Sequence, residues 1–356
     1  MNTLVIVPHS QSAVDYHRLI IPFTNIQNVI FIEGAEYYNS LTKEANINLT
    51  VDYLVKNNIG IVWFSRNISP ILLNPDPIYR LLKSLGIKIV IDIDDNPKVD
   101  YGSLFHRFRI DTNIQHSEIT QIKAADYVCV THEHLRTIIN KEYNYPKDRI
   151  IVAANGIDSK ETQYNTEFTY KLENVFWQGS VTHHNDLKQL SEALNEMQQK
   201  IYIAGYNAES HYIDKQGNKV QHWEETGKLF KFKQWIHSAP VIEYMKFYQN
   251  KGICVIPLEK TRFTVCKSNL KMLEAGWAKK PVIASGIHPY NVLGKDGVNC
   301  EFAYKKNTWI ESISYILENP NYADDLRFKL HEDVKDNFMI DKVNQSRIDL
   351  INKIKK

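Results

Sequence analysis

The sequence predicts an α/β protein made of two doubly wound parallel-sheet domains. Short runs rich in Val and Ile alternate with longer amphipathic stretches, and within these runs apolar residues do not alternate with polar ones. Strands covered by helices on both faces have this character, and a repeated strand–helix–strand order implies right-handed crossovers. The chain has 356 residues, which is long for one hydrophobic core and suits two domains.

The expected elements follow the same order in both halves of the chain. In the first half, strands are expected at 4–8, 28–32, 60–64, 87–93, 127–131 and 150–153, and helices at 51–57, 78–85 and 117–125. The pattern restarts after the polar stretch 159–169, with strands at 175–177, 200–204, 254–257 and 281–284, and helices at 187–197, 268–277, 309–317, 323–337 and 341–355. We therefore expect an amino-terminal domain at 1–158, a carboxyl-terminal domain at 159–340 and a terminal helix at 341–356.

The composition is that of a globular protein, with 43% hydrophobic and 24% charged residues. The net charge of +2 provides no global field for nucleic acid, although a local basic patch is compatible with it. The first ten residues are too short and lack the basic flank of a signal peptide, and no apolar stretch approaches the roughly 20 residues of a membrane span. A cytoplasmic protein is therefore expected. Its cysteines lack metal-ligand spacing and three lie in apolar or motif-like runs, so buried reduced thiols are expected; they are Cys129, Cys254, Cys266 and Cys300.

The most informative stretch for function is 253–290. Its strand ends in a polar loop, and a helix is expected to begin near Lys267, with Ser268 or Asn269 as its cap. Free backbone amides and the Lys267 ammonium at that point would hold a diphosphate without a metal. Glu274, about two turns further along, can accept hydrogen bonds from a ribose diol. The alternative is that Lys267 and Glu274 form an ordinary exposed pair on a helix.

Further motifs extend over nearly the whole chain in a defined order. They are Ala125-Asp126-Tyr127-Val128-Cys129-Val130-Thr131, Asn155-Gly156-Ile157-Asp158, Gln178-Gly179-Ser180, the spaced Trp235, Pro240 and Tyr244, then Phe263, Lys267-Ser268-Asn269-Leu270-Lys271, Glu274-Ala275-Gly276 and Pro289-Tyr290. Together they resemble the GT-B glycosyltransferases of family four. The resemblance implies two Rossmann-like domains that face a central cleft, with the C-terminal helix crossing back to the amino-terminal domain.

The resemblance also implies an activity. A sugar would pass from a nucleotide diphosphate sugar, UDP- or GDP-linked, to an acceptor hydroxyl with retention of configuration. Relatives generally work without a metal, so neither a metal nor another cofactor is implied. The leaving phosphate would help to deprotonate the acceptor, so no dedicated protein base would be needed. The implied donor-binding residues are Gly179, Ser180, Lys267, Ser268, Glu274 and Tyr290.

The sequence departs from the family pattern at two places. Cys266 stands where many members carry the first of two glutamates, which faces the donor sugar. Ser180, Thr182, His183 and His184 follow the glycine turn where many members carry an Arg and a Lys. The adjacent histidines would point to different faces of a helix, which favours a helix entry over a metal site.

Candidate catalytic residues lie in the amino-terminal half. Asp94 and Asp95 end the fourth strand, and they would contact the acceptor or the sugar, form a turn, or bind Mg²⁺. No second ligand cluster is evident, so we predict no metal. His132, after the fifth strand, would touch the transferred sugar or sit in solvent at a helix start. Tyr16 and Arg18 would line the acceptor side, or lie on a helix surface.

The acceptor is left open at this stage. A cell-surface saccharide or glycoconjugate is one candidate. A hydroxymethylated pyrimidine in phage DNA is another, and the high Asn, Ile, Lys and Tyr content suits an AT-rich bacterial or phage genome. A degenerate GT-B protein kept for binding is the non-enzyme alternative. The basic, aromatic segment 228–235 would be a single-stranded nucleic-acid platform or an amphipathic strand or loop.

Overall fold

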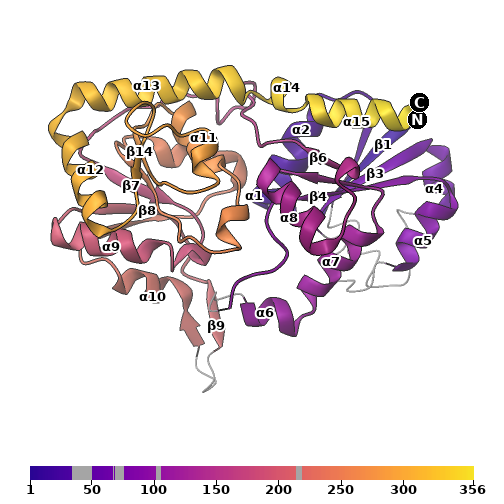
Figure 1. Cartoon of the computed structure of the whole chain (residues 1–356), viewed down its shortest axis with the longest axis horizontal. Helices are drawn as coiled ribbons and strands as arrows, with labels where there is room; N and C mark the ends of the chain where they lie inside the picture. The colour runs from indigo at the N-terminus through magenta and orange to yellow at the C-terminus, as the bar shows by residue number, and fades with distance from the viewer. Residues whose placement is uncertain (34–49, 67, 69–75, 102–105, 214–218) are drawn as a thin grey trace. The chain divides into compact units, whose positions relative to one another are not determined.

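The computed structural model describes the chain apart from residues 34–49, 67, 69–75, 102–105 and 214–218 (Figure 1). Its contacts divide the chain into two compact units. The first unit contains Met1–Asp158, Cys266–Ser268 and Ile340–Lys356, and the second contains Ser159–Val265 and Asn269–Met339. Each unit is described by itself below.

The first unit is built on a six-stranded parallel sheet in the order β2-β1-β3-β4-β5-β6. The strands are β1 (Asn2–Val7), β2 (Val29–Glu33), β3 (Ile59–Ser65), β4 (Lys88–Ile93), β5 (Tyr127–Val130) and β6 (Ile150–Val152). The chain adds β2 on one side of β1 and then crosses to add β3 on the other. The winding direction therefore reverses between β1 and β3, and a doubly wound sheet usually binds its ligand beside the carboxyl ends of such a pair.

Helices cover this sheet and connect its strands. They are α1 (Ala13–Asp15), a π-helical turn (Tyr16–Ile20), α2 (Ile21–Thr24), α4 (Val51–Lys56), α5 (Asp76–Ser84), α6 (His106–Asp111), α7 (Ile114–Ala124) and α8 (Glu133–Tyr143). The expected strand at 28–32 and helix at 51–57 have observed counterparts in β2 and α4. Between them, residues 34–49 lie outside the described part of the chain.

The chain ends in two helices that belong to the first unit, α14 (Ile340–Val343) and α15 (Gln345–Lys355). Leu350 and Ile351 of α15 join the core cluster that contains Trp63 and Cys129. Burying each of these two aliphatic side chains contributes about 1.5 to 3 kcal/mol. The expected return of the C-terminal helix to the amino-terminal domain is thus observed.

The second unit is built on another six-stranded parallel sheet, in the order β11-β8-β7-β12-β13-β14. The strands are β7 (Val175–Gln178), β8 (Ile201–Tyr206), β11 (Lys233–His237), β12 (Cys254–Ile256), β13 (Val282–Ser285) and β14 (Glu301–Ala303). Its helices include α9 (Leu187–Glu196), α10 (His222–Lys228), α11 (Leu270–Trp277), α12 (Lys306–Glu318) and α13 (Pro320–Asn337). Here the winding direction reverses between β7 and β12.

Two features of the second unit differ from the expected elements. The basic segment 228–235 ends in β11, a half-exposed edge strand, so part of it forms the amphipathic strand that was one of the two alternatives. A short antiparallel hairpin of β9 (His211–Ile213) and β10 (Lys219–Gln221) was not expected.

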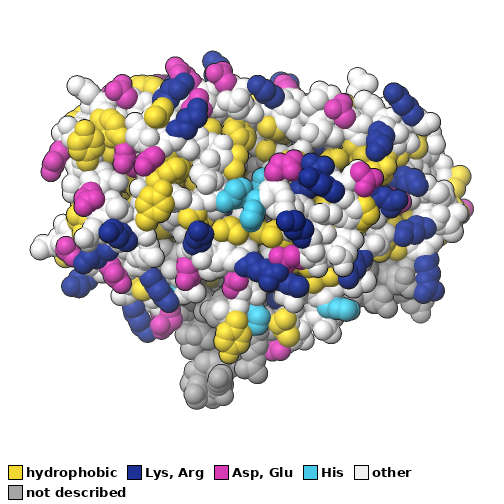
Figure 2. All heavy atoms as spheres, in the orientation of Figure 1, with side chains coloured by type: hydrophobic (Ala, Val, Ile, Leu, Met, Phe, Trp, Pro, Cys, Tyr) yellow, Lys and Arg dark blue, Asp and Glu magenta, His cyan; other side chains and the backbone are white. Residues whose placement is uncertain are grey.

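Acidic and basic side chains are interspersed over the face of the molecule in Figure 2, as expected for a net charge of +2. Among the described residues, no helix combines the length and the apolar character that crossing a membrane requires.

Candidate functional site

Polar residues gather at the switch point of the second sheet. Gly179 and Ser180 directly follow β7, and Glu259 lies shortly after β12, the strand that pairs with β7. Helix α11 contributes Lys271 from its first turn and Glu274 from its second. Parallel strands present their carboxyl ends at the same edge of a sheet, so these groups belong to one region of the second unit.

The turn after β7 is packed too closely to tolerate a side chain. A Cβ on Gly179 would lie 2.6 Å from Cζ2 of Trp177 and 2.9 Å from Nζ of Lys271. Gly205, at the end of β8, has a φ of +102°, and a Cβ there would lie 2.2 Å from the Gly179 carbonyl oxygen. The backbone of the turn therefore lies directly beside the Lys271 ammonium, with no side chain between them.

A chain of hydrogen bonds holds Lys271 in place. Its Nζ donates to Nε2 of His183 at 3.1 Å, so the ring proton of the neutral imidazole is on Nδ1. That Nδ1 donates to Asp186 at 2.5 Å, and Asp186 also accepts the backbone N–H of Glu259 at 2.8 Å. The ammonium lies 5.0 Å from the centre of the Trp177 ring, within cation–π range. A positive charge is thus fixed beside the Gly179 turn.

Glu274 is a buried carboxylate in the same region, with 3% of its surface exposed. Gln178 Nε2 donates to its Oε2 at 2.5 Å, and the Tyr248 hydroxyl donates to the same oxygen at 3.4 Å. Burial raises the pKa of Glu274 to about 7, although the Gln178 hydrogen bond and the nearby Lys271 act in the opposite direction. Tyr290 is also buried, and burial raises the pKa of its hydroxyl.

Helix α11 begins later than expected. It starts at Leu270, and Asn269, one of the two predicted caps, occupies the cap position, although its side chain makes no capping hydrogen bond. The Lys267 ammonium lies 3.9 Å from Asp95, and the Ser268 hydroxyl accepts a hydrogen bond from Asn155 at 3.0 Å. By their contacts, Lys267 and Ser268 belong to the first unit, whereas Glu274 belongs to the second. The lysine in the first turn of α11 is Lys271, to which we had assigned no role.

Asp94 and Asp95 are paired with an arginine. Arg66 holds both oxygens of Asp94, with Nε to Oδ1 at 2.6 Å and Nη2 to Oδ2 at 2.7 Å, and it also donates to Asp95 at 3.1 Å. Burial opposes ionisation, but the Arg66 ion pair outweighs it and lowers the pKa of Asp94. For Asp95, burial is the larger effect and raises the pKa. Within the described part of the chain, no group of three or more His, Cys, Asp or Glu side chains is arranged to hold a metal ion.

His132 is buried at the start of α8 rather than in solvent, so that alternative is wrong. Its Nδ1 accepts the backbone N–H of Leu135 at 3.1 Å, which in the neutral ring leaves the proton on Nε2. Nε2 donates to the carbonyl oxygens of Cys266 at 3.1 Å and of Lys267 at 3.0 Å, all within the first unit. The proposed contact of His132 with a sugar stays a prediction.

Arg18 and Tyr16 lie in the interior, with 1% and 3% of their surface exposed, so the helix-surface alternative is wrong for both. The Arg18 guanidinium donates to Asp92 at 2.7 Å and to the Ala153 carbonyl oxygen at 2.8 Å. This guanidinium therefore belongs to a buried ion pair, and the acceptor-side contacts of Arg18 and Tyr16 stay a prediction.

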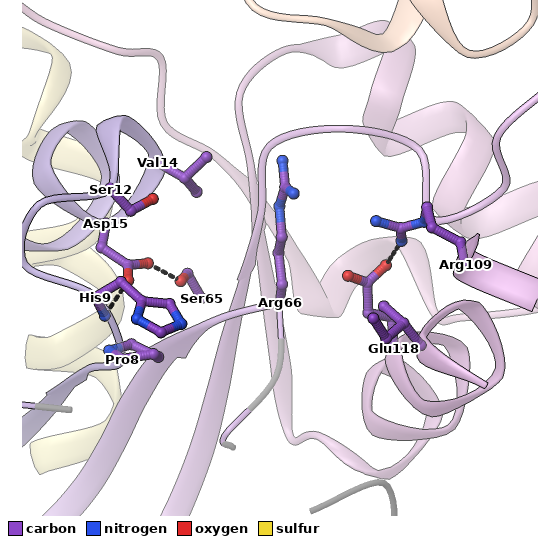
Figure 3. A pocket seen from close by; sticks show the side chains of 10 residues that line it. Pro8, His9, Ser12, Val14, Asp15, Ser65, Arg66, Arg109 and Glu118 are labelled. Atoms are coloured by element: carbon purple, nitrogen blue, oxygen red, sulfur yellow. Dashed lines mark hydrogen bonds and ion pairs between the residues drawn. The ribbon is translucent and has the colours of Figure 1, made fainter. Parts of the chain in front are cut away.

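The first unit contains a cavity that sequence reasoning missed, shown in Figure 3. It measures about 240 Å³ and lies at the carboxyl ends of β1 and β3, the switch point of the first sheet. Asp15, His9, Ser65 and Arg66 line it together with Arg109 from α6. The sequence could have indicated this cavity. The residues directly after the predicted first and third strands lie at the switch point of a doubly wound sheet, where ligands usually bind.

Comparison with known proteins defines the fold. No protein-family model matches the sequence, and no curated protein matches it. Among solved structures, the chain is similar to a glycosyltransferase from Rickettsia africae, with 12% identity over 100% of this chain and 98% of that one and a TM-score of 0.63. It is similar to Anabaena HepE in complex with UDP-glucose, with 11% identity, 99% and 100% coverage and a TM-score of 0.64.

The chain is also similar to TarM from S. aureus, with 13% identity over 82% of this chain and 55% of TarM, and a TM-score of 0.58. These similarities establish the fold as GT-B. They confirm the prediction of an α/β protein with two Rossmann-like domains.

Proposed function

We propose that the protein is a glycosyltransferase that uses a nucleotide diphosphate sugar, UDP- or GDP-linked, as donor. The observation that carries this proposal is the Lys271 ammonium fixed beside the Gly179 turn, at the switch point of the second sheet. The similar HepE structures, determined with UDP and with UDP-glucose, support this class of donor.

In this proposal, the diphosphate binds to Lys271 and to the backbone amides of the Gly179-Ser180 turn. Cleavage of the bond between sugar and diphosphate leaves a developing negative charge on the diphosphate. Donors already fixed in place stabilise that charge without reorganising, which lowers the barrier. The hydrogen bond from Lys271 to His183, itself held by Asp186, provides this preorganisation. Lys267, in the first unit, is proposed as a second cation for the diphosphate, and Ser268 as a further donor contact.

Glu274 is proposed to bind the ribose of the donor. A carboxylate accepts hydrogen bonds from both hydroxyls of a vicinal diol, and the hydrogen bond from Gln178 orients this carboxylate. Because the pKa of Glu274 is about 7, ribose binding at neutral pH would favour its ionised form. Tyr290, which is buried, is proposed as a further residue of the donor-binding site.

We further propose a retaining, metal-independent reaction in the cytoplasm, in which the leaving phosphate takes the acceptor proton. Asp94, Asp95 and His132 stay candidates for contacts with the sugar or the acceptor. A saccharide or glycoconjugate is the proposed acceptor class.

The test is calorimetric titration with UDP-, GDP-, ADP- and CDP-sugars. Lys271→Met is expected to weaken binding of the preferred donor about tenfold to a hundredfold, because a charge-assisted hydrogen bond contributes about 1.5 to 3 kcal/mol. Lys335→Met, at an exposed position on α13, is the matched control and should bind like the wild type. No binding by the wild type across the panel would refute the proposed function and favour a degenerate binding protein. Equal binding by Lys271→Met and wild type would refute the assigned site.

A further inference from the structure

We propose that the cavity of the first unit is an acceptor subsite that takes a neutral sugar ring. This inference rests on the proposed glycosyl transfer, because it names the class of acceptor. The cavity lies at the switch point between β1 and β3, where doubly wound sheets bind ligands. Its volume of about 240 Å³ lies below the range of about 300 to 1,000 Å³ that drug-sized ligands occupy. The space therefore suits one ring rather than an extended chain.

The charges around the cavity disfavour an anion. Arg109 is paired with Glu118, and Arg66 is paired with both Asp94 and Asp95. Asp15 adds a further carboxyl group, which accepts hydrogen bonds from the His9 backbone N–H at 2.8 Å and from the Ser65 hydroxyl. Lys267 also lies 3.9 Å from Asp95, so among these described residues three cationic side chains face four carboxyl groups.

No excess positive charge is left for a phosphate or a carboxylate ligand. An incoming anion would compete with the resident carboxylates for the arginines and would be repelled by them. Burial raises the pKa values of Asp15 and Glu118, which weakens this repulsion, but the ion pairs of Arg66 with Asp94 and of Arg109 with Glu118 still occupy both guanidinium groups. A phosphodiester backbone would meet the same repulsion.

The same groups suit a neutral polyol. Carboxyl oxygens accept hydrogen bonds from sugar hydroxyls, and guanidinium N–H groups donate to the hydroxyl oxygens. In Figure 3, the Arg66 side chain lies between the Asp15 cluster on one side and the Arg109–Glu118 pair on the other, so polar groups flank the space on two sides. Pro8, Val14 and Ile114 also line the cavity and offer apolar surface to the C–H groups of a ring.

The first test is ligand-observed NMR with methyl hexosides, compared with glucuronate and glucose 6-phosphate. We expect saturation transfer to at least one neutral glycoside, and binding of the two anions at least about tenfold weaker. Val14→Trp places an indole at the cavity without changing any charge, and it should abolish binding. Val55→Trp is the matched control, because Val55 is 65% exposed on α4 and does not line the cavity. Melting temperatures of both variants show whether they fold.

Stronger binding of an anionic sugar, or undiminished glycoside binding by a folded Val14→Trp variant, would overturn the proposal. So would tight binding of hydroxymethylated single-stranded DNA that Val14→Trp abolishes. Titration of the same samples with the UDP-, GDP-, ADP- and CDP-sugars separates the two proposals. Failure of all four nucleotide sugars to bind would refute the proposed function, whereas normal binding of one of them with no glycoside bound would refute only the neutral-sugar subsite.

A second variant tests the charge argument directly. Glu118→Gln keeps the shape of the side chain and an oxygen that can accept from Arg109, but removes one negative charge beside the cavity. Affinity for glucose 6-phosphate should rise about fivefold to tenfold, while affinity for the methyl glycoside changes less than about threefold. An unchanged affinity for the phosphate in the folded variant would show that charge does not select the ligand.

Discussion

Glu274 makes the stability of the second unit depend on pH, in a direction that the structure defines. Burial raises the pKa of this carboxyl group to about 7 from an ordinary value of 4.5. Between these two values, the folded protein holds a proton that the unfolded chain has released. Stability therefore falls as the pH rises from about 4.5 to about 7, and this contribution is constant above that range.

The Glu274→Gln variant removes this dependence, because an amide has nearly the shape of the protonated acid and does not ionise. Each unit of difference in pKa corresponds to about 1.36 kcal/mol. Between pH 5 and pH 8, the free energy of unfolding of the variant should rise relative to that of the wild type by about 2 to 3 kcal/mol. At pH 5 the two proteins should be close in stability.

Urea titrations followed by tryptophan fluorescence provide the assay, because Trp63 is the only one of the six tryptophans that lies in the first unit. Glu243→Gln is the control, since a half-exposed carboxylate loses little solvation on folding and its replacement should leave the pH dependence of the wild type unchanged. If the stability difference between Glu274→Gln and wild type were the same at pH 5 and pH 8, the account of a buried, largely protonated Glu274 would be wrong.

Three further predictions concern the backbone, the C-terminal helix and metal dependence. Gly205→Ala should destabilise the second unit by more than about 3 kcal/mol, because it combines a left-handed φ with a clash against the Gly179 carbonyl oxygen. Gly86→Ala, with a φ of +71° and no neighbouring atom within 4 Å, should cost only about 1 to 2 kcal/mol; thermal melts compare the two, and equal losses would refute the clash. A chain that ends at Met339 lacks α14 and α15 and should lose several kcal/mol of stability in the first unit, measured by hydrogen exchange; unchanged protection of β3 and β6 would contradict this. EDTA should leave donor turnover intact, and loss of turnover that Mg²⁺ restores would revive a metal site at the aspartates.

The sheets were predictable from sequence because their central strands are buried on both faces. Such strands need continuous apolar runs, and the strand expected at 127–131 is observed as β5 at Tyr127–Val130. The edge strand β11 lacked this signal, because Lys233 and Gln234 are at least partly exposed and interrupt any apolar run. Whether a segment forms an edge strand or a turn depends on residues that are distant in the chain, so the local sequence pattern does not predict it.

The side chains of the site were less predictable than the fold. The motif predicted Lys267 as the lysine at the start of the helix. Because α11 begins at Leu270, the lysine in its first turn is Lys271. Arg18 looked accessible in sequence because its partner, Asp92, is 74 residues away and only the folded sheet brings the pair together. An ion pair between residues so far apart in the chain cannot be predicted from the local sequence.

The central claim is that the switch point of the second sheet binds a nucleotide diphosphate through Lys271 and the Gly179 turn. A crystal structure of the protein with its preferred nucleotide sugar, chosen by calorimetry, tests it most directly. We expect a diphosphate oxygen within about 3 Å of Lys271 Nζ and another within reach of a backbone amide of the turn. A well-ordered nucleotide whose diphosphate contacts neither group would contradict the account.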